Sequence, residues 1–391
     1  MTDVMQERRS RVVGLDAHPY MFSAAALSGS DALQARIDWE VDRLPLDRLE
    51  DIILRKTVPG DIIVLEASGN SFAITERLAR CNRLAVVLES QSVGKVSKTY
   101  CTTDRTSAVK IARVYLSGLA HVVWQPDEQA MARRELFFAY RNSVRDSVRA
   151  RNRIWAWFNG CGMRRPVRLR LSEAGALQSI LALKEWSPTQ RVIIESLLAS
   201  LQEAERRRKK FNAMIAEEVA TDPKLLKVVR LLGVKHLVAF ALAAFIGPIE
   251  RFASPRKLVA YFGLNPSVHR SGNGGGNGAL AHYGRSDVRA MLIQAAHSIL
   301  RYGQGNTHTW AVALKMRKGA ALAIAALARK LVVSVWYLMA GLFSPMTELS
   351  ATICIKIHKI ATLIGAARIK ELGYSSLRAF ENDKQQILLA T

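Results

Sequence analysis

The chain has 391 residues, and its most unusual global property is its charge. Lys and Arg number 56 against 33 Asp and Glu, which gives a formal net charge of +23. A surplus of this size attracts polyanions by releasing their condensed counterions, so nucleic acid is the expected partner. The apolar fraction of 49% supports folded cores and argues against a wholly disordered chain.

Membrane insertion and secretion are not expected. The longest apolar runs, Leu237–Ile246 and Leu331–Phe343, are shorter than the roughly 20 residues that a membrane-spanning helix needs. Residues 1–11 are polar and charged, which is not the pattern of a signal peptide. The cysteines have neither CxxC nor Cys/His spacing, which argues against a zinc site or a disulfide framework: Cys81, Cys101, Cys161 and Cys354. A cytoplasmic location is therefore expected.

The first part of the chain predicts an α/β domain. Two apolar runs after Arg11 predict a β-hairpin, with Asp16 near the end of its first strand. The elements expected next are a strand at Ala35–Val41, a helix at Leu46–Arg55, a strand at Asp61–Glu66, a helix at Phe72–Arg80 and a strand at Leu84–Leu88. The succession of three strands, helix, strand, helix and strand matches an RNase H-like layout.

Three carboxylates accompany these elements. Asp16 and Glu66 stand at strand ends, and Asp104 opens a helical stretch at Asp104–Leu119. Taken singly, each acid also fits a solvated turn, and Asp104 fits an acidic residue favoured by the helix dipole. Taken together, they can converge on Mg²⁺ (or Mn²⁺), which prefers oxygen ligands. Their order favours metal-assisted phosphoryl chemistry.

A basic helical region is expected in the middle of the chain. Asp127–Phe158 has a helical pattern in which arginines alternate with aromatic residues: Arg133, Arg134, Arg141, Arg145, Arg149, Arg151 and Arg153, with Phe137, Phe138, Tyr140, Trp155 and Trp157. Guanidinium groups suit phosphates, and aromatic rings can stack on unpaired bases. The alternative is that the rings are buried against the first domain while the arginines are solvated. After a shorter helix at Glu173–Glu185, Thr189–Val219 predicts a coiled coil with its own neighbour or across a dimer.

Two short helices around Gly233 follow. They resemble a helix-hairpin-helix, whose turn amides can bind a phosphate, and a plain αα-hairpin in a core is the alternative. Ser254 and Pro255 then begin a helix over Arg256–Phe262.

Glycines are densest between Asn265 and Arg289, where they surround Ser271. Glycine-rich backbone indicates mobility or close approach to a ligand. The run is flanked by basic residues, which are His269, Arg270, His282, Arg285 and Arg289. The segment therefore fits either a serine that attacks a phosphate or a surface loop between helices.

Several ordered motifs resemble those of the DEDD insertion-sequence transposases, the IS one-ten group that also includes the Piv and MooV DNA invertases. Gly14–His18, Leu65–Asn70 and Thr103–Arg113 look like the three acidic motifs of that family. Gly233–Arg289 resembles its C-terminal transposase domain, with a Gly-Leu-Asn-Pro turn at Gly263–Pro266 before the Ser-Gly pair at Ser271.

The resemblance implies a fold of α/β plus α type. It implies a RuvC-like RNase H-fold domain over residues 1–125 and a helical, coiled-coil region over 126–220. A mainly helical C-terminal domain, with the helix-hairpin-helix-like segment, would follow over 221–345. The tail, 346–391, matches nothing in the family.

The resemblance also implies roles for particular residues. Asp16, Glu66 and Asp104 would be catalytic metal ligands, but the fourth acid of the family pattern falls on Ser107, a far weaker ligand. Ser271 would be the nucleophile, and Ser267 is the second choice. The phosphate and nucleic-acid contacts implied are Arg270, Arg285 and Arg289.

The implied function is a recombinase that cleaves and rejoins DNA through a covalent phosphoserine. Family members act as dimers or higher oligomers and use a structured RNA, encoded beside the gene, to choose donor and target DNA. The expected partners are therefore DNA, a guide RNA and further copies of the chain in a dimer or tetramer. Three alternatives remain open, which are a Piv-type invertase, a metal-only nuclease of branched DNA and a catalytically inactive nucleic-acid-binding relative.

Overall fold

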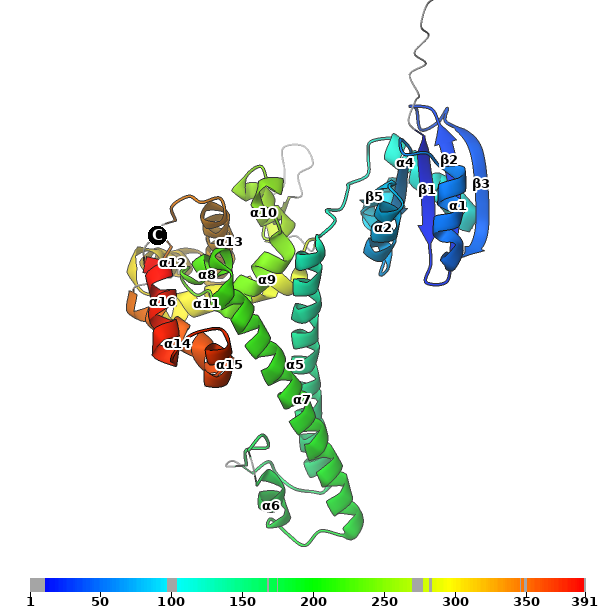
Figure 1. Cartoon of the computed structure of the whole chain (residues 1–391). Helices are drawn as coiled ribbons and strands as arrows, with labels where there is room; N and C mark the ends of the chain where they lie inside the picture. Colours follow the sequence, from blue (N-terminus) through cyan, green and yellow to red (C-terminus); the bar gives the residue numbers. More distant parts are fainter. Residues whose placement is uncertain are drawn as a thin grey trace, which may run out of the picture. The chain divides into compact units, whose positions relative to one another are not determined.

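The structure, a computed structural model, describes residues 11–96, 104–166, 169–173, 175–268, 277–280, 283–344, 346–347 and 350–389. The chain divides into two compact units, Met1–Pro126 and Asp127–Thr391, each shown in Figure 1. The expected boundary after residue 125 falls beside this division. The expected divisions after residues 220 and 345 lie inside the second unit.

The first unit is built on a five-stranded mixed sheet with the order β3-β2-β1-β4-β5. The strands are β1 (Val12–Ala17), β2 (Met21–Ser28), β3 (Arg36–Pro45), β4 (Ile62–Glu66) and β5 (Leu84–Leu88). Strands β1, β2 and β3 pair antiparallel, whereas β4 is parallel to β1 and β5 is parallel to β4. The helices are α1 (Leu49–Lys56), α2 (Ser71–Arg80), α3 (Ser90–Val96) and α4 (Asp104–Leu116), with a 3₁₀ turn at Leu46–Arg48. The predicted succession of strands and helices is present.

The two faces of this sheet pack against different helices because successive strand residues point to opposite sides. Leu15 and Ile63 share one buried cluster with Leu49 of α1 and Ile74 of α2. On the other face, strand residues that include Val12, Val64 and Leu88 share a cluster with Ala108 and Ala112 of α4. Helix α4 therefore covers the face opposite α1 and α2.

Gly14 of β1 allows α4 to touch the sheet directly. A Cβ at this position would lie 1.9 Å from the carbonyl oxygen of Ala108. Any side chain would push the helix away, so this glycine sets the distance between α4 and β1.

The second unit is mainly helical. Its helices are α5 (Glu128–Gly160), α6 (Ala176–Leu181), α7 (Pro188–Thr221), α8 (Pro223–Val229), α9 (His236–Ile246), α10 (Pro255–Tyr261), α11 (Ser286–Tyr302), α12 (Gly305–Lys318), α13 (Ala320–Met339), α14 (Ser350–Ile364), α15 (Ala366–Glu371) and α16 (Leu377–Leu389). A 3₁₀ turn spans Ile249–Arg251, and two short strands are β6 (Pro266–Val268) and β7 (Asn277–Leu280). Helix α9 is the centre of this unit, since every residue from Ala239 to Ile246 is buried. A helix that is apolar all round needs neighbours on all sides.

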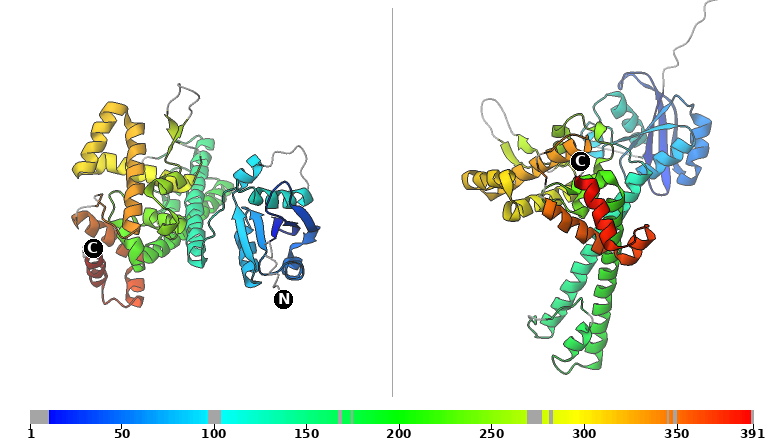
Figure 2. Two further views of the ribbon diagram at one scale, coloured as in Figure 1. Left: turned by 90° about the horizontal axis from the view of Figure 1, so that it is seen from above. Right: turned by 60° about the vertical axis from the view of Figure 1, so that its left-hand side comes forward.

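The predicted long helix pairs with its own neighbour. Helices α5 and α7 lie side by side and project from the body of the unit, with α6 near their far end (Figure 2). Their starts carry the expected caps. Asp127 accepts a hydrogen bond from the Ala130 amide, and Ser187 and Gln190 form a capping box.

The C-terminal tail is part of the same fold. Ile360 of α14, Ile369 of α15 and Phe380 of α16 are buried in the core cluster that also contains α9. Arg368 forms an ion pair with Glu217 of α7 at 2.7 Å. The tail that resembled nothing thus completes the core of the second unit.

Among the described helices, α13 is long and apolar enough to cross a membrane by length and composition. Its residues Ala323, Leu327, Leu331 and Val335 recur at helical spacing and are fully buried within the chain. That pattern is typical of a core helix.

Candidate functional site

Two of the predicted metal ligands lie at the same edge of the first unit's sheet. Leu15 of β1 pairs with Leu65 of β4 in a parallel register, so Asp16 and Glu66 are the next residues on adjacent strands. Residues at the same level of neighbouring parallel strands are about 5 Å apart and point to the same face. The Asp16 side chain is 22% exposed, which leaves it accessible.

The segments that follow these two strands are tied together. The Nδ2 of Asn70 donates a hydrogen bond of 3.2 Å to the carbonyl oxygen of His18. The Nε2 of His18 lies 3.9 Å from Oδ1 of Asp16. Asn70 occupies the N-cap position of α2, but its side chain makes no cap hydrogen bond there. In the sequence Asn70 is only the last residue of the Leu65–Asn70 motif, and its contact with His18 depends on the fold.

The third predicted ligand begins helix α4. Asp104 is the first residue of that helix. It lies four residues before Ala108, the residue that approaches Gly14 of β1. The side chain of Asp104 lies outside the described residues. Ser107 is half-buried on the same helix. Among the side chains that the structure describes, no three His, Cys, Asp or Glu residues gather to hold a metal. Two carboxylates at one sheet edge fit a hard cation, and Asp104 is needed to complete the predicted set.

The predicted serine belongs to the connection of a short β-hairpin in the second unit. Strands β6 and β7 are antiparallel, with Pro266 opposite Leu280 and Val268 opposite Asn277. Ser271 lies between these strands, in residues 269–276, and so do His269 and Arg270; all three lie outside the described residues, as does His282. Ser267, the second choice, lies in β6 itself.

The base of this hairpin is a close contact between two backbone segments. Gly263 has φ +66° and Gly284 has φ +87°. A Cβ at Gly263 would lie 2.0 Å from the Tyr283 carbonyl oxygen, and one at Gly284 would lie 2.6 Å from that of Tyr261. The Arg285 amide donates to the same Tyr261 oxygen at 3.3 Å. Close backbone approach, one of the two expectations for this glycine-rich stretch, occurs here.

Arg285 and Arg289, both predicted phosphate contacts, hold this base in the described structure. The Nη1 of Arg289 donates to the carbonyl oxygen of Tyr283 at 2.9 Å. The Arg285 guanidinium lies 4.0 Å from the centre of the Phe245 ring and donates to Asp287 at 2.8 Å. The Nε of Arg285 is buried and has no hydrogen-bond partner among the described residues.

Two further arginines surround the C-terminal end of α9, and sequence reasoning missed this role. The Nε of Arg134 donates to the Ala244 carbonyl at 2.9 Å, and Arg251 donates to the Ile246 carbonyl at 2.6 Å and to that of Phe245 at 2.9 Å. The last carbonyls of a helix lack partners within it and carry partial negative charge. Burial lowers the pKa of both guanidinium groups.

We refer to Arg134, Arg251 and Arg285 as the arginine cluster. Arg134 and Arg285 contact the same ring, Phe245, and Arg251 contacts Tyr261, the residue that accepts from the Arg285 amide. The cluster therefore joins the end of α9 to the base of the β6–β7 hairpin. The sequence singled out Arg285 by its closeness to the glycine run and Arg134 as one of the arginines of Asp127–Phe158, but not Arg251.

The basic helix α5 differs from its expected role. Phe137 and Phe158 are fully buried, and Trp157 stacks on Trp186 with ring centres 5.0 Å apart, all within the second unit. Four of the arginines pair with carboxylates: Arg133 with Glu218 and Asp222, Arg141 with Asp287, Arg149 with Asp146, and Arg151 with Glu205. Phe137 is therefore not available to stack on a base, whereas Trp157 is half-buried and Phe138 is 40% exposed. Arg145 and Arg153 are exposed, so their guanidinium groups can reach phosphates as predicted.

The turn around Gly233 favours the plain αα-hairpin. The amides of Leu231 and Val234 donate to carbonyls of the turn itself, and that of Leu232 donates to the Met346 carbonyl at 2.8 Å. These three amides are therefore not available to a phosphate. Gly233 has φ +73°, and a Cβ there would lie 2.8 Å from Ile299 of α11.

Comparison with known proteins identifies one segment of the chain. Residues 227–310 match the model of the family described as Transposase IS116/IS110/IS902 family. This segment contains α9, the β6–β7 hairpin and α11, with two members of the arginine cluster.

Three curated relatives carry transposase names. The transposase for insertion sequence element IS1111A of Coxiella burnetii is 34% identical over 27% of this chain and 30% of its own length. The putative transposase y4qE of Sinorhizobium fredii is 25% identical over 59% of this chain and 56% of its own length. The probable family 20 transposase of Pseudomonas aeruginosa is 27% identical over 38% and 44%.

The chain thus spans between 30% and 56% of the length of these relatives. It is similar to insertion-sequence transposases of the IS116/IS110/IS902 family. The family model matches the segment that contains the β6–β7 hairpin, which we call the serine hairpin because Ser271 lies between its strands in the sequence.

Proposed function

We propose that this chain is the transposase of an insertion sequence and that it cleaves and rejoins DNA through Ser271. The observation that carries the proposal is the family match over residues 227–310, because that segment includes the hairpin in whose connection Ser271 lies. The relatives' transposase names and the net charge of +23 support the same conclusion.

The proposed reaction is a transesterification. The Oγ of Ser271 forms a bond to the phosphorus of a phosphodiester, while the bond from phosphorus to one deoxyribose oxygen breaks. The hydroxyl proton leaves the serine, and the departing oxygen takes up a proton. A phosphoserine keeps the energy of the ester bond, so a strand-end hydroxyl can reverse the step and rejoin DNA.

The basic groups at the hairpin base would balance the charge of the phosphate. Arg270 is in the same connection as Ser271, and Arg285 and Arg289 hold the base of the hairpin. Fixed cations beside a developing negative charge lower the barrier to reaction.

Asp16, Glu66 and Asp104 would hold Mg²⁺ or Mn²⁺, which when bound supplies Lewis-acid stabilisation of the phosphate. The strand order β3-β2-β1-β4-β5 supports the RNase H-like, RuvC-like assignment of the first unit. Ser107 stands where the resembled family has a fourth carboxylate, so three carboxylates would carry the metal. Asn70 would keep the segments after β1 and β4 together, and with them Asp16 and Glu66.

We further propose that a structured RNA guides the choice of DNA and that the chain acts as a dimer or tetramer. The net charge of +23 supports binding of nucleic acid. Exposed Arg145 and Arg153 of α5 are candidate contacts.

Replacement of the serine tests the proposal. The Ser271→Ala variant should lose DNA strand cleavage while it retains binding of DNA and RNA, because only the attacking oxygen is removed. Ser267→Ala, which changes the second-choice serine in β6 of the same hairpin, is the companion variant and should still cleave DNA. Recombination by Ser271→Ala at the wild-type rate would disprove the assignment.

A further inference from the structure

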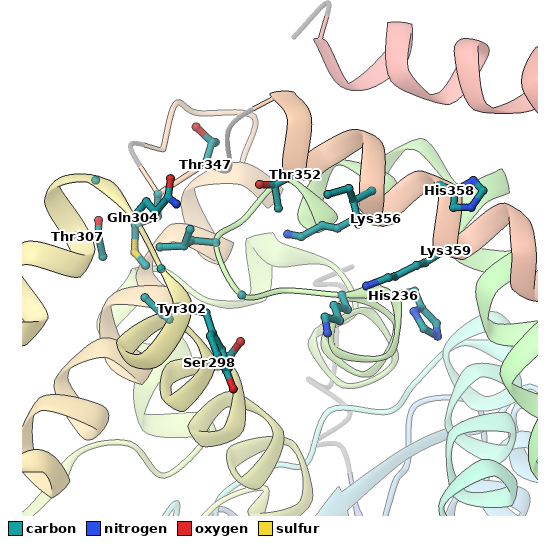
Figure 3. A pocket seen from close by; sticks show the side chains of 18 of the residues that line it. His236, Ser298, Tyr302, Gln304, Thr307, Thr347, Thr352, Lys356, His358 and Lys359 are labelled. Atoms are coloured by element: carbon teal, nitrogen blue, oxygen red, sulfur yellow. The ribbon is translucent and has the colours of Figure 1, made fainter.

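A cavity of about 930 Å³ lies within the second unit, away from the serine hairpin in sequence. It is bounded by the turn between α8 and α9, the end of α11, the start of α12 and the exposed side of α14 (Figure 3). Ligand pockets of about 300–1,000 Å³ hold molecules of the size of a nucleotide. The cavity combines residues of the family segment with residues 346–363 of the tail.

The charge of this cavity is positive. Lys235, Lys356 and Lys359 line it, and none of its described lining residues is Asp or Glu. Lys356 is buried and donates to the Val229 and Leu231 carbonyls at 2.8 and 2.9 Å, which fixes α14 against the α8–α9 turn. Lys235 and Lys359 are exposed to solvent. Cations without carboxylates around one cavity favour an anionic ligand.

His236 and His358, the two histidines that line the cavity, add little positive charge to it. Burial lowers the pKa of His236 to about 4, and its Nε2 lies 2.9 Å from Oδ1 of Asn212. This imidazole is therefore neutral near pH 7 and acts as a hydrogen-bonding group. His358 lies 2.8 Å from Glu381, which balances any charge it carries. The lysines are left as the cationic groups that face a ligand.

The remaining lining has one polar and one apolar part. Gln304, Thr307 and Thr352 supply hydrogen-bonding side chains near the starts of α12 and α14. Tyr302 of α11 supplies an aromatic ring; this residue is 70% exposed, and the guanidinium of Arg301 lies 5.2 Å from the centre of the ring. A ligand that is anionic at one end and flat at the other matches both parts, because aromatic side chains stack on bases and lysines bind phosphate.

We propose that this cavity binds one nucleotide, with its phosphate against Lys235 and Lys359 and its base against the exposed ring of Tyr302. The nucleotide is either free or one unit of a single strand that enters the cavity. None of these residues belongs to the serine hairpin or to the acidic sheet edge, so the binding is separable from strand cleavage.

Calorimetric titration of the full chain tests the site. The probes are AMP, adenosine, inorganic phosphate and an oligodeoxyadenylate of five nucleotides. AMP should bind at least about tenfold more tightly than adenosine or phosphate, because only AMP engages both parts of the cavity. Lys359→Glu should weaken this binding by about tenfold or more. Lys370→Glu is the matched control, since Lys370 is an exposed lysine of α15 that does not line the cavity.

The two ligand sources give different results. If AMP binds and Lys359→Glu weakens that binding, the ligand is a free nucleotide. If only the oligonucleotide binds, and Lys359→Glu weakens that binding, the ligand is one unit of a single strand. Lys235→Glu is a second charge reversal in the cavity lining, at a residue outside α14. Far-ultraviolet circular dichroism shows whether each variant is folded. The proposal is overturned if neither probe binds at millimolar concentration, or if Lys370→Glu weakens binding as much as Lys359→Glu. DNA strand cleavage by the Lys359→Glu variant is measured in parallel. A variant that loses nucleotide binding but still cleaves DNA shows that the two proposals stand or fall separately.

Discussion

At the scale of single residues, the serine hairpin depends on two glycines whose backbones meet. Gly263 and Gly284 both have positive φ, and each lies where a Cβ would collide with a carbonyl oxygen of the opposite segment. The Arg289 side chain bridges the same two segments. The connection that contains Ser271 therefore starts from a fixed base.

Replacing Gly263 by alanine should disable this base. The new Cβ would lie 2.0 Å from the Tyr283 carbonyl, so the two segments must separate, and the residue has an unfavourable φ of +66° as well. We expect lost strand cleavage and a free energy of unfolding lowered by about 2 kcal/mol or more. Gly341→Ala is the control, because Gly341 has φ +75° but open space around it. Equal stability and equal cleavage in the two variants, measured by urea unfolding and gel assay, would contradict the steric argument.

His236 predicts a pH dependence of stability. Its folded-state pKa of about 4 lies below the ordinary value of 6.5, because burial disfavours the charged ring. As the pH falls from 6.5 towards 4, the unfolded chain takes up a proton before the folded chain does, so the free energy of unfolding decreases. The full effect is on the order of 3 kcal/mol at about 1.4 kcal/mol for each pKa unit.

Urea unfolding at pH 7, 6 and 5 measures this effect. The curve of His236→Gln should be flatter than that of wild type over this range, while His297→Gln, which changes an exposed histidine of α11, should follow wild type. Parallel curves for His236→Gln and wild type would show that the buried imidazole is not the cause.

At the scale of elements, the α5–α7 pair encloses a polar cluster between its apolar contacts. Glu205 of α7 is 8% exposed and accepts hydrogen bonds from Ser147 at 2.6 Å and Arg151 at 3.0 Å. Arg208 of the same helix contacts its other oxygen. A buried polar group of this kind can fix the register of two helices, because any slip leaves it without partners.

Removing Glu205 should weaken this pair of helices. The Glu205→Ala variant leaves the Ser147 hydroxyl and the Arg151 guanidinium without their shared acceptor, and we expect a loss of about 3 kcal/mol in the free energy of unfolding. The control is Glu203→Ala, whose carboxylate is exposed and pairs with Arg206 on the same helix. Faster amide hydrogen exchange should be confined to α5 and α7. Equal stability of the two variants would show that Glu205 does not fix the pair.

The sequence predicted the elements of the first unit because their signals are local. Strand alternation, the Pro59–Gly60 break and the acids at strand ends all act within a few residues. The predicted third strand ended at Val41, whereas β3 continues to Pro45 and pairs with Met21 and Phe22 across a bulge. Asp42 and Arg43, with which the extension begins, are polar and exposed, so they interrupted the apolar pattern before Leu44.

The parts of the second unit that were not predicted depend on distant contacts. Strands β6 and β7 have three and four residues, too few to show a period. Arg134 and Arg251 are separated by more than a hundred residues, and only the folding of α9 between them makes both contact its last carbonyls. The helices of the tail join a core whose other members lie far away in sequence.

At the scale of the whole molecule, the proposed chemistry is divided between the two units. The carboxylates Asp16, Glu66 and Asp104 belong to the first unit, and the hairpin with Ser271 belongs to the second. Neither set suffices for the proposed reaction, since a serine alone is a weak nucleophile and a metal site alone would activate water. The proposed reaction therefore requires residues of both units.

A covalent intermediate on Ser271 is the most direct test of this account. The chain is incubated with Mg²⁺, its copurified RNA and DNA that carries the ends of the element, then denatured, digested with protease and nuclease, and analysed by mass spectrometry. The account predicts a peptide in which Ser271 carries a nucleotide through a phosphodiester, absent from Ser271→Ala. Cleaved DNA with free ends and no such peptide would contradict it and would assign the chain to the metal-only nucleases that attack with water.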